Sequence, residues 1–112
     1  MSNITNESTL AFMQDRPYRK SNTVVELGED CTKLLLHGNL IAIRKNDARR
    51  TLLITSAGWK SKTTKSRLNA LPNVDIQTKA GKWHLNGKQW DGRLADVTND
   101  IDYMLSFIQK IF

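Results

Sequence analysis

The stretch that decides the fold is "TVVELGEDCTKLLLHGNLIAIRKNDARRTLLIT", which spans residues 23–55. It contains four short apolar runs, at 23–27, 32–37, 40–44 and 50–55, and the polar groups "GED", "HGN" and "KNDA" separate them. Apolar side chains recur at every second position in the last two runs, which is typical of strands with one buried face. Because the runs are short and the turns between them are tight, we predict an antiparallel meander.

A second group of strand-like residues lies nearer the C-terminus. Alternating residues run through 74–78, and Trp83 and Leu85 alternate after the turn "KAGK". The dipeptides Asn-Gly and Asp-Gly mark two further turns on either side of 89–90, because both tolerate positive φ. The sequence therefore predicts about five to seven short strands in all.

The stretch "GWKSKTTKSRLNAL" at 58–71 connects the two groups. Its "AG" neighbour breaks the preceding strand, and Thr63 and Thr64 are good candidates for a helix N-cap. Pro72 disfavours the helical conformation in the residue before it. We therefore predict a short helix near 63–71.

The end of the chain carries the clearest helical pattern. Apolar residues recur there in steps of four, four, three and four, namely Val97, Ile101, Leu105, Ile108 and Phe112. Such a stripe predicts an amphipathic helix that packs across one face of the sheet. Tyr103 and Phe107 lie beside the stripe, where they either widen the core face or contact a partner. That partner could be a second copy of this chain, which would make the protein a homodimer.

The first part of the chain has a different composition. Residues 1–21 are polar and rich in Ser, Asn and Thr, which favours a flexible arm, with an extended edge piece as the alternative. Residues 22–112 are expected to form a single domain, since 112 residues is close to the common domain size. The predicted fold is α+β: an antiparallel sheet of short strands, one short central helix and a C-terminal amphipathic helix on one face.

The positive charge is concentrated in the middle of the chain. The net charge is +6, and residues 44–82 hold ten cations against two anions, which gives +8 for that segment. The flanks carry four cations against five anions and three against four, or −1 each. A basic segment of this kind favours a polyanionic partner, most often nucleic acid, although a solvated surface that keeps the protein soluble would look the same.

The composition argues against several classes of function. Cys31 is the one cysteine, so an internal disulfide is excluded, and with only His37 and His84 a zinc site is not expected. No signal peptide and no long apolar run is present, so we expect a protein of a reducing compartment that does not span a membrane. No catalytic motif appears, and both histidines are expected to be ordinary structural or surface residues. We therefore expect neither an enzyme nor a bound cofactor.

The basic stretch around the short helix is the better candidate for a site. Cations, hydroxyl groups and an aromatic ring are the groups that bind phosphates and bases. No base-reading motif accompanies them, so binding through the nucleic-acid backbone with low sequence preference is expected. The candidate residues are Arg49, Arg50, Trp59, Lys60, Lys62, Thr63, Thr64, Lys65 and Arg67.

Simpler roles compete for the same residues. Thr63 and Thr64 can cap a helix without any ligand, and a tryptophan such as Trp59 that follows a strand is more often a core residue than a stacking surface. Leu68 and Leu71 are expected to be buried. The helix would then be oriented so that Lys65 and Arg67 only partly share its exposed face. Both interpretations stay open at this point.

Three quoted stretches together resemble a family of small uncharacterised tailed-bacteriophage proteins. They are "LHGNLIA", "TLLITSAGWKSKTTKSRLNAL" and "KWHLNGKQWDG", and they cover roughly residues 34–92. The resemblance rests mainly on the block "GW-x-T-x-TTK-x-RLN", in which this chain has Ser61 at the first Thr position. It implies a phage origin and action in the host bacterial cytoplasm, and it supplies no activity and no catalytic residues.

Two functions follow as expectations. The first is a non-catalytic phage accessory protein that binds nucleic acid through the basic surface around residues 44–82. The second is an inhibitor of a host protein or defence complex, anti-CRISPR-like or active in host takeover, that acts by protein–protein contact through Tyr103 and Phe107 or through the same basic face.

Overall fold

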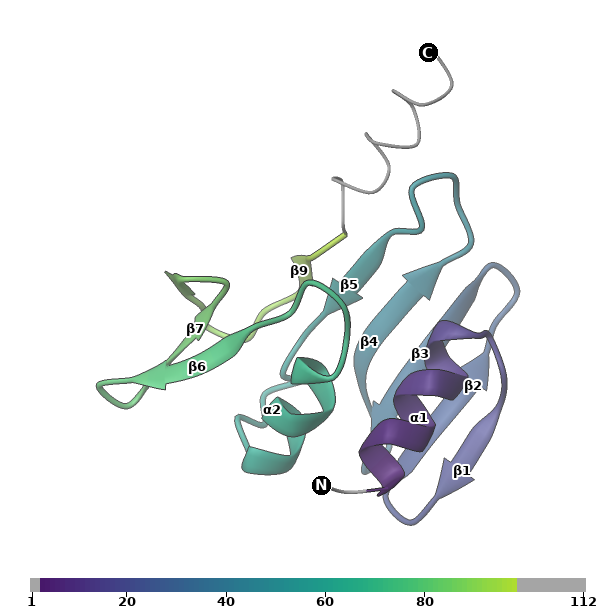
Figure 1. Cartoon of the computed structure of the whole chain (residues 1–112), viewed down its shortest axis with the longest axis horizontal. Helices are drawn as coiled ribbons and strands as arrows, with labels where there is room; N and C mark the ends of the chain where they lie inside the picture. The colour runs from purple at the N-terminus through teal and green to yellow at the C-terminus, as the bar shows by residue number, and fades with distance from the viewer. Residues whose placement is uncertain (1–2, 99–112) are drawn as a thin grey trace.

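The structure is a computed structural model, and it describes residues 3–98 of the chain (Figure 1). It is an α+β fold with two antiparallel sheets. The six-stranded sheet has the order β1-β2-β3-β4-β5-β9, and the three-stranded sheet has the order β6-β7-β8. The elements are α1 (Asn3–Met13), β1 (Tyr18–Lys20), β2 (Thr23–Leu27), β3 (Cys31–Leu36), β4 (Asn39–Lys45), β5 (Leu52–Ile54), α2 (Lys62–Asn69), β6 (Ile76–Lys79), β7 (Lys82–Leu85), β8 (Lys88–Gln89) and β9 (Ala95–Asp96).

The predicted meander is confirmed as strands β2 to β5, each paired antiparallel with the next. Its apolar residues lie on one face, as the alternation requires: in β3, Thr32, Leu34 and Leu36 are buried and the residues between them are half-buried. The short strand β9 returns from the second sheet and pairs with β5, where Leu53 lies opposite Asp96. The prediction of a single sheet is therefore wrong, because strands β6 to β8 pair only among themselves.

The N-terminal segment differs from the expected flexible arm. Residues Asn3–Met13 form a helix, and the chain then adds the edge strand β1 to the sheet. Helix α1 lies over β2 and β3 (Figure 1), and Phe12 is fully buried there. The polar composition was misleading because Thr5 and Ser8 are also buried, at helical spacing with Phe12, and Ser8 donates its hydroxyl to the Thr5 carbonyl.

The predicted central helix is present as α2, but its cap lies earlier than Thr63 or Thr64. Ser61 has extended backbone angles and accepts a hydrogen bond from the Thr64 amide at 3.1 Å, which makes it the N-cap. Thr64 is instead buried, and its hydroxyl bonds that of Ser61 at 2.9 Å. Leu68 is buried as expected. Ser61 was not among the predicted caps, and the helix therefore begins one residue earlier than expected, at Lys62.

The second sheet is attached to the end of α2. The Asn69 side chain accepts a hydrogen bond from the Ile76 amide at 2.7 Å and donates one to the Ile76 carbonyl at 3.1 Å. Trp83 is buried and stacks on Trp90 with ring centroids 6.2 Å apart, and Trp83 and Ile76 belong to the same buried core as the apolar residues of the six-stranded sheet. Leu71, which follows α2, is buried in this core.

The predicted C-terminal helix lies outside the described residues, and so do Tyr103 and Phe107. Only Val97 and Thr98 of that segment are described. Both are buried, and the Asn73 side chain donates to the Val97 carbonyl at 2.9 Å.

Candidate functional site

A tight corner between β5 and α2 positions Trp59. Ala57 and Gly58 both have positive φ, 55° and 81°, and the Trp59 amide donates to the Ser56 carbonyl at 2.9 Å. Two successive residues with positive φ reverse the chain within four residues. The corner therefore turns the chain away from the sheet just before the helix and leaves the Trp59 side chain 63% exposed. The open question about Trp59 is thus decided in favour of a surface position.

Gly92 supports this corner from the other side of the chain. Its carbonyl accepts hydrogen bonds from the Ser56 amide at 2.8 Å and from the Thr55 hydroxyl at 2.9 Å. A Cβ atom at Gly92 would lie 2.2 Å from the Ser56 Oγ atom, and its φ is +90°. The position therefore needs glycine for two independent reasons, close approach and backbone conformation.

The turn between β3 and β4 faces the corner. His37 and Gly38 have φ of 53° and 79°, and they connect Leu36 to its cross-strand partner Asn39. This tight reversal is the predicted "HGN" turn. It brings the ends of two strands next to the start of α2.

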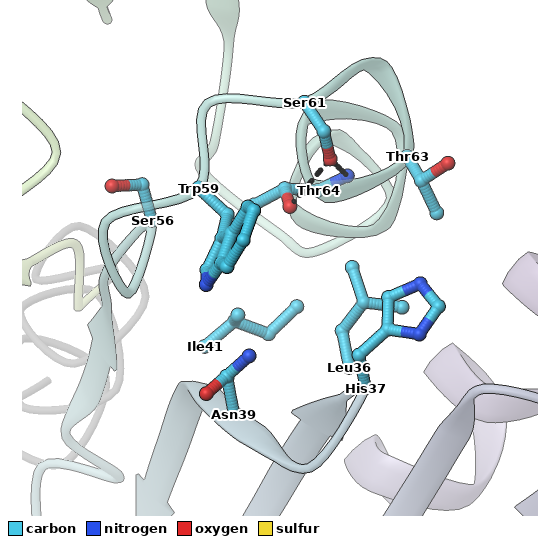
Figure 2. A pocket seen from close by; sticks show the side chains of 9 residues that line it. All are labelled: Leu36, His37, Asn39, Ile41, Ser56, Trp59, Ser61, Thr63 and Thr64. Atoms are coloured by element: carbon cyan, nitrogen blue, oxygen red, sulfur yellow. Dashed lines mark hydrogen bonds between the residues drawn. The ribbon is translucent and has the colours of Figure 1, made fainter.

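A hollow with a volume of about 400 Å³ lies between the turn and the corner (Figure 2). Figure 2 shows the Trp59 ring facing Ile41 and Asn39, with Leu36 and His37 across the hollow. The buried side chains of Leu36 and Ile41 give it an apolar floor, and hydroxyl and amide groups surround the opening. Its lining residues are Leu36, His37, Asn39, Ile41, Ser56, Trp59, Ser61, Thr63 and Thr64.

Five lysines lie on α2, just before it, and on the β6–β7 hairpin. Lys65 donates to the Thr78 hydroxyl at 2.8 Å, which places α2 against the β6–β7 hairpin, where Lys79 pairs with Lys82 across the strands. Among residues 3–98, none of these lysines forms an ion pair with a carboxylate. We call this set the lysine cluster; it consists of Lys60, Lys62, Lys65, Lys79 and Lys82.

Arg67 does not belong to that surface, contrary to expectation. It is 5% exposed, and its guanidinium donates to the Thr23 hydroxyl at 3.2 Å and to the Thr5 hydroxyl. Burial lowers the pKa of Arg67, against an opposing influence from Tyr18. The side chain therefore fixes α1 and α2 to the sheet instead of contacting solvent.

Arg49 and Arg50 lie at the opposite end of the sheet. They belong to the β4–β5 connection, and the seven residues of β4 separate this connection from the hollow by roughly 20 Å at the usual rise of a strand (Figure 1). Arg49 forms an ion pair with Asp96 at 3.8 Å, and Arg50 donates to the Asn46 side chain at 3.0 Å. The cations of the basic surface expected around residues 44–82 are thus divided between two separate places.

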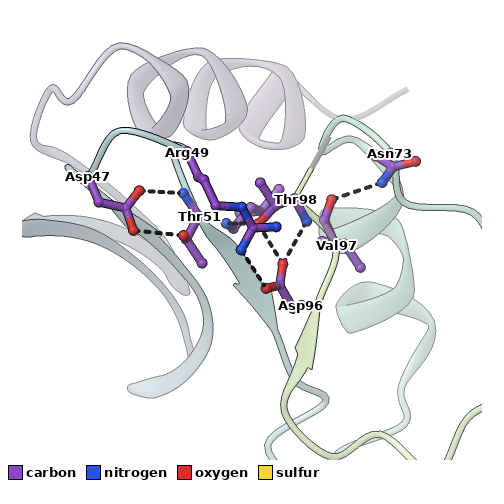
Figure 3. Close-up of polar contacts among 8 residues, drawn as sticks. Asp47, Arg49, Thr51, Asn73, Asp96, Val97 and Thr98 are labelled. Atoms are coloured by element: carbon purple, nitrogen blue, oxygen red, sulfur yellow. Dashed lines mark hydrogen bonds and ion pairs between the residues drawn. The ribbon is translucent and has the colours of Figure 1, made fainter. Parts of the chain in front are cut away.

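Carboxylates organise that opposite end (Figure 3). Asp47 accepts hydrogen bonds from the Thr51 amide at 2.9 Å and the Thr51 hydroxyl at 2.7 Å, and these bonds lower the pKa of Asp47. Asp96 accepts from the Thr98 hydroxyl and amide, which lowers the pKa of Asp96, and Arg49 contributes in the same direction. The Thr98 hydroxyl also accepts from the Leu52 amide at 2.9 Å.

Within residues 3–98, no group of three or more His, Cys, Asp or Glu side chains is placed to hold a metal ion. His37 is exposed, with its Nε2 atom 3.4 Å from the Asn22 side chain, and His84 Nδ1 lies 3.2 Å from the Lys82 carbonyl oxygen. No helix in the same range is long and apolar enough to cross a lipid bilayer.

Six lining residues were absent from the candidates predicted from the sequence, namely Leu36, His37, Asn39, Ile41, Ser56 and Ser61. The signal for them was the "HGN" turn. In an antiparallel meander β3 and β5 run in the same direction. The turn that follows β3 therefore lies at the same end of the sheet as the corner that follows β5.

Residues 1–107 match the family described as Kyanoviridae Gp96 protein. The chain belongs to the Kyanoviridae Gp96 protein family. The resemblance to phage proteins is thereby confirmed, while the "GW-x-T-x-TTK-x-RLN" block stays a prediction as the signature of the family. No curated protein and no solved structure gives a significant match.

Proposed function

We propose that this member of the Kyanoviridae Gp96 protein family is a non-catalytic accessory protein that binds nucleic acid in the cytoplasm of the infected bacterium. The observation that carries the proposal is the lysine cluster. Its five ammonium groups lie around α2 and the β6–β7 hairpin without an ion pair among residues 3–98. Cations without carboxylate partners are the ones available to phosphates.

The geometry also limits what kind of binding is proposed. Lysine is a flexible point charge, so it neutralises phosphates without the bidentate geometry with which arginine reads guanine. Binding through the cluster is therefore carried by release of counterions from the nucleic acid and depends strongly on salt. We propose Lys60, Lys62 and Lys65 as the central contacts, with Thr63 beside them and Lys79 and Lys82 at the edge.

The test is a salt titration of binding to a labelled single-stranded oligonucleotide, followed by fluorescence anisotropy. For the wild type, the logarithm of the binding constant should fall linearly with the logarithm of salt concentration, by about 0.7 for each phosphate neutralised. The double variant Lys60→Glu/Lys62→Glu should bind far more weakly and show a shallower slope.

A matched control keeps the total charge equal. Lys45→Glu/Arg50→Glu changes the net charge by the same amount at the opposite end of β4, and it should retain nearly wild-type affinity. If both double variants lose affinity equally, the effect is one of net charge and the proposed surface is wrong. The absence of any wild-type binding at low salt would refute the function itself.

A second candidate, inhibition of a host protein by direct contact, has one specific observation in its favour. The sheet face opposite α1 and α2 carries a group of half-buried aliphatic side chains, in which Val24 lies opposite Leu35 and Ile43 lies opposite Leu53. Such a face suits an apolar partner surface. Tyr103 and Phe107 stay predictions for this contact.

This candidate is tested by affinity capture from nuclease-treated lysate of the phage's host. It requires a captured host protein that Ile43→Glu loses and Lys60→Glu/Lys62→Glu retains. Loss with the lysine variant instead would place the contact on the basic surface.

A further inference from the structure

We propose that the hollow beside Trp59 receives one unpaired nucleobase, so that the protein prefers single-stranded nucleic acid to duplex. This inference rests on the proposed function, because it names the form of nucleic acid that the lysine cluster would hold. It goes beyond phosphate contacts, which carry no preference for an exposed base.

Trp59 is the first reason. Its side chain is 63% exposed, whereas Trp83 is 7% exposed and stacks on Trp90. The indole of Trp90 donates to the Arg93 carbonyl at 2.9 Å, but within residues 3–98 the indole N–H of Trp59 has no acceptor. Exposed aromatic rings beside cations are the usual stacking surfaces for single-stranded nucleic acid, since every base has a π face.

The composition of the hollow is the second reason. A flat heterocycle needs apolar contact on its faces and polar partners at its edge. Leu36 and Ile41 supply an apolar floor below the Trp59 ring (Figure 2). Asn39 and Thr63 supply an amide and a hydroxyl at the rim, and neither side chain is engaged in a hydrogen bond within residues 3–98. An amide that can both donate and accept suits the edge of any base without selecting strongly among them.

Size and connectivity are the third reason. A volume of about 400 Å³ lies at the lower end of the range for small-molecule pockets and has room for a base with its sugar. Lys60 and Lys62 alternate along the chain with the lining residues Ser61 and Thr63, and both lysines are exposed. A base in the hollow therefore brings its own phosphates close to the lysine cluster.

A duplex can place a base in the hollow only at an additional cost in free energy. Its bases are paired and stacked, and one of them would have to be turned out of the helix before it could enter. A single strand offers its bases directly, so the hollow converts a surface that attracts any polyanion into one that favours single strands.

The experiment compares three labelled ligands of equal length: oligothymidylate, the same phosphate–sugar chain without bases, and a blunt duplex. Affinity is measured by anisotropy at one salt concentration for the full chain. Oligothymidylate should bind most tightly. Trp59→Ala should weaken its binding about 5-fold to 150-fold, the range that one lost base stack implies, and should leave the binding of the base-free chain unchanged.

Two variants serve as controls. Trp59→Phe keeps an aromatic face and should retain most of the preference for oligothymidylate. Leu94→Ala removes another large apolar side chain that is 61% exposed, a value close to that of Trp59, and should change nothing.

Each outcome separates the two proposals. Equal wild-type affinity for oligothymidylate and the base-free chain overturns the base pocket and leaves the nucleic-acid function standing. No binding of any of the three at low salt overturns the proposed function and this inference with it. If thymidine monophosphate displaces the oligonucleotide at concentrations near the dissociation constant of the oligonucleotide, the occupant is a free nucleotide and the preference for strands is wrong.

Discussion

The two ends of the six-stranded sheet use their charges in opposite ways. At the end with the β3–β4 turn and the β5–α2 corner, the lysine cluster forms no ion pair among residues 3–98, and an apolar hollow opens beside it. At the end with the β4–β5 connection and β9, Arg49 pairs with Asp96, and both Asp47 and Asp96 accept hydrogen bonds from threonines. Under the proposed function the first end binds the ligand, whereas the hydrogen bonds and the ion pair of the second end connect β4, β5 and β9.

The number of cations in the sequence overstates the positive charge that is free of ion pairs in the folded chain. Residues 44–82 carry a net charge of +8 in the sequence, and the fold distributes it among different tasks. Arg44 pairs with Asp15 at 2.8 Å, Arg49 pairs with Asp96, and Arg67 is buried. The charge without an ion pair is smaller than the count suggests, and among residues 3–98 it comprises the lysine cluster as well as Lys45 and Arg50 at the opposite end.

The largest expected loss of stability comes from Gly92→Ala, a substitution at the end of the sheet where the hollow lies. The new methyl group would meet the Ser56 side chain, and the residue would have to keep a positive φ. Backbone strain of about 1–2 kcal/mol and overpacking of about 1–3 kcal/mol should together lower the free energy of unfolding, measured by urea denaturation. Because Ser56 carries the corner, ligand binding at Trp59 should weaken as well.

Gly81→Ala is the matched control for that prediction. Gly81 also has a positive φ, +77°, but a Cβ atom there would meet nothing within 4 Å. It should therefore cost about 1–2 kcal/mol from strain alone. If the two variants are equally destabilised, the close contact between Gly92 and Ser56 contributes nothing, and the described corner is wrong.

A smaller effect is expected from removing the helix cap at the same end. Ser61→Ala should lower the free energy of unfolding by about 1 kcal/mol, because the Thr64 amide loses its acceptor. Thr63→Ala changes a neighbouring hydroxyl that caps nothing, so its unfolding midpoint in urea should stay near that of the wild type. A larger loss in the Thr63 variant would restore the cap that the sequence suggested.

Much of the fold could be predicted because it depends on local pattern. Alternation and turn dipeptides are short-range signals, and they located the strands of the meander and the β6–β7 hairpin. Helix α1 was missed because its buried face includes Thr5 and Ser8, whose hydroxyls look like surface residues until the partner of each is known. Its contact with Arg67 joins residues 62 positions apart, a separation that no local pattern encodes.

The candidate site was predicted in part for the same reason. The stretch around Trp59 stood out by its composition. Whether Trp59 can contact a ligand depends on the exposure of its side chain, which the β5–α2 corner determines. That corner is hydrogen-bonded to Gly92, which lies 36 positions after Ser56. Arg67 and Lys65 are two positions apart and share one helix, yet one is buried and the other reaches the Thr78 hydroxyl. The angular position of each residue on α2 decides which cation faces solvent. This orientation of the helix can be known only when the elements that pack against α2 are known.

The smallest expected effect concerns acid and the opposite end of the sheet. The hydrogen bonds from Thr51 hold the pKa of Asp47 below its ordinary value, and those from Thr98 do the same for Asp96. A carboxyl with a lower pKa in the folded chain binds fewer protons there than in the unfolded chain. Its contribution to stability is therefore complete above the ordinary aspartate pKa of about 3.9 and is lost as the pH falls through the folded value.

The urea midpoint of the wild type should accordingly fall between about pH 5 and pH 3. The variant Asp47→Asn/Asp96→Asn should begin lower at neutral pH and fall less, since it has two fewer carboxyls to protonate. Lys60→Glu/Lys62→Glu, changed at the other end, should lose ligand affinity while keeping the part of the acid dependence that Asp47 and Asp96 supply. If the asparagine variant falls by as much as the wild type, these two carboxylates do not stabilise their end of the sheet, and the contrast between the two ends reduces to the unpaired lysines alone.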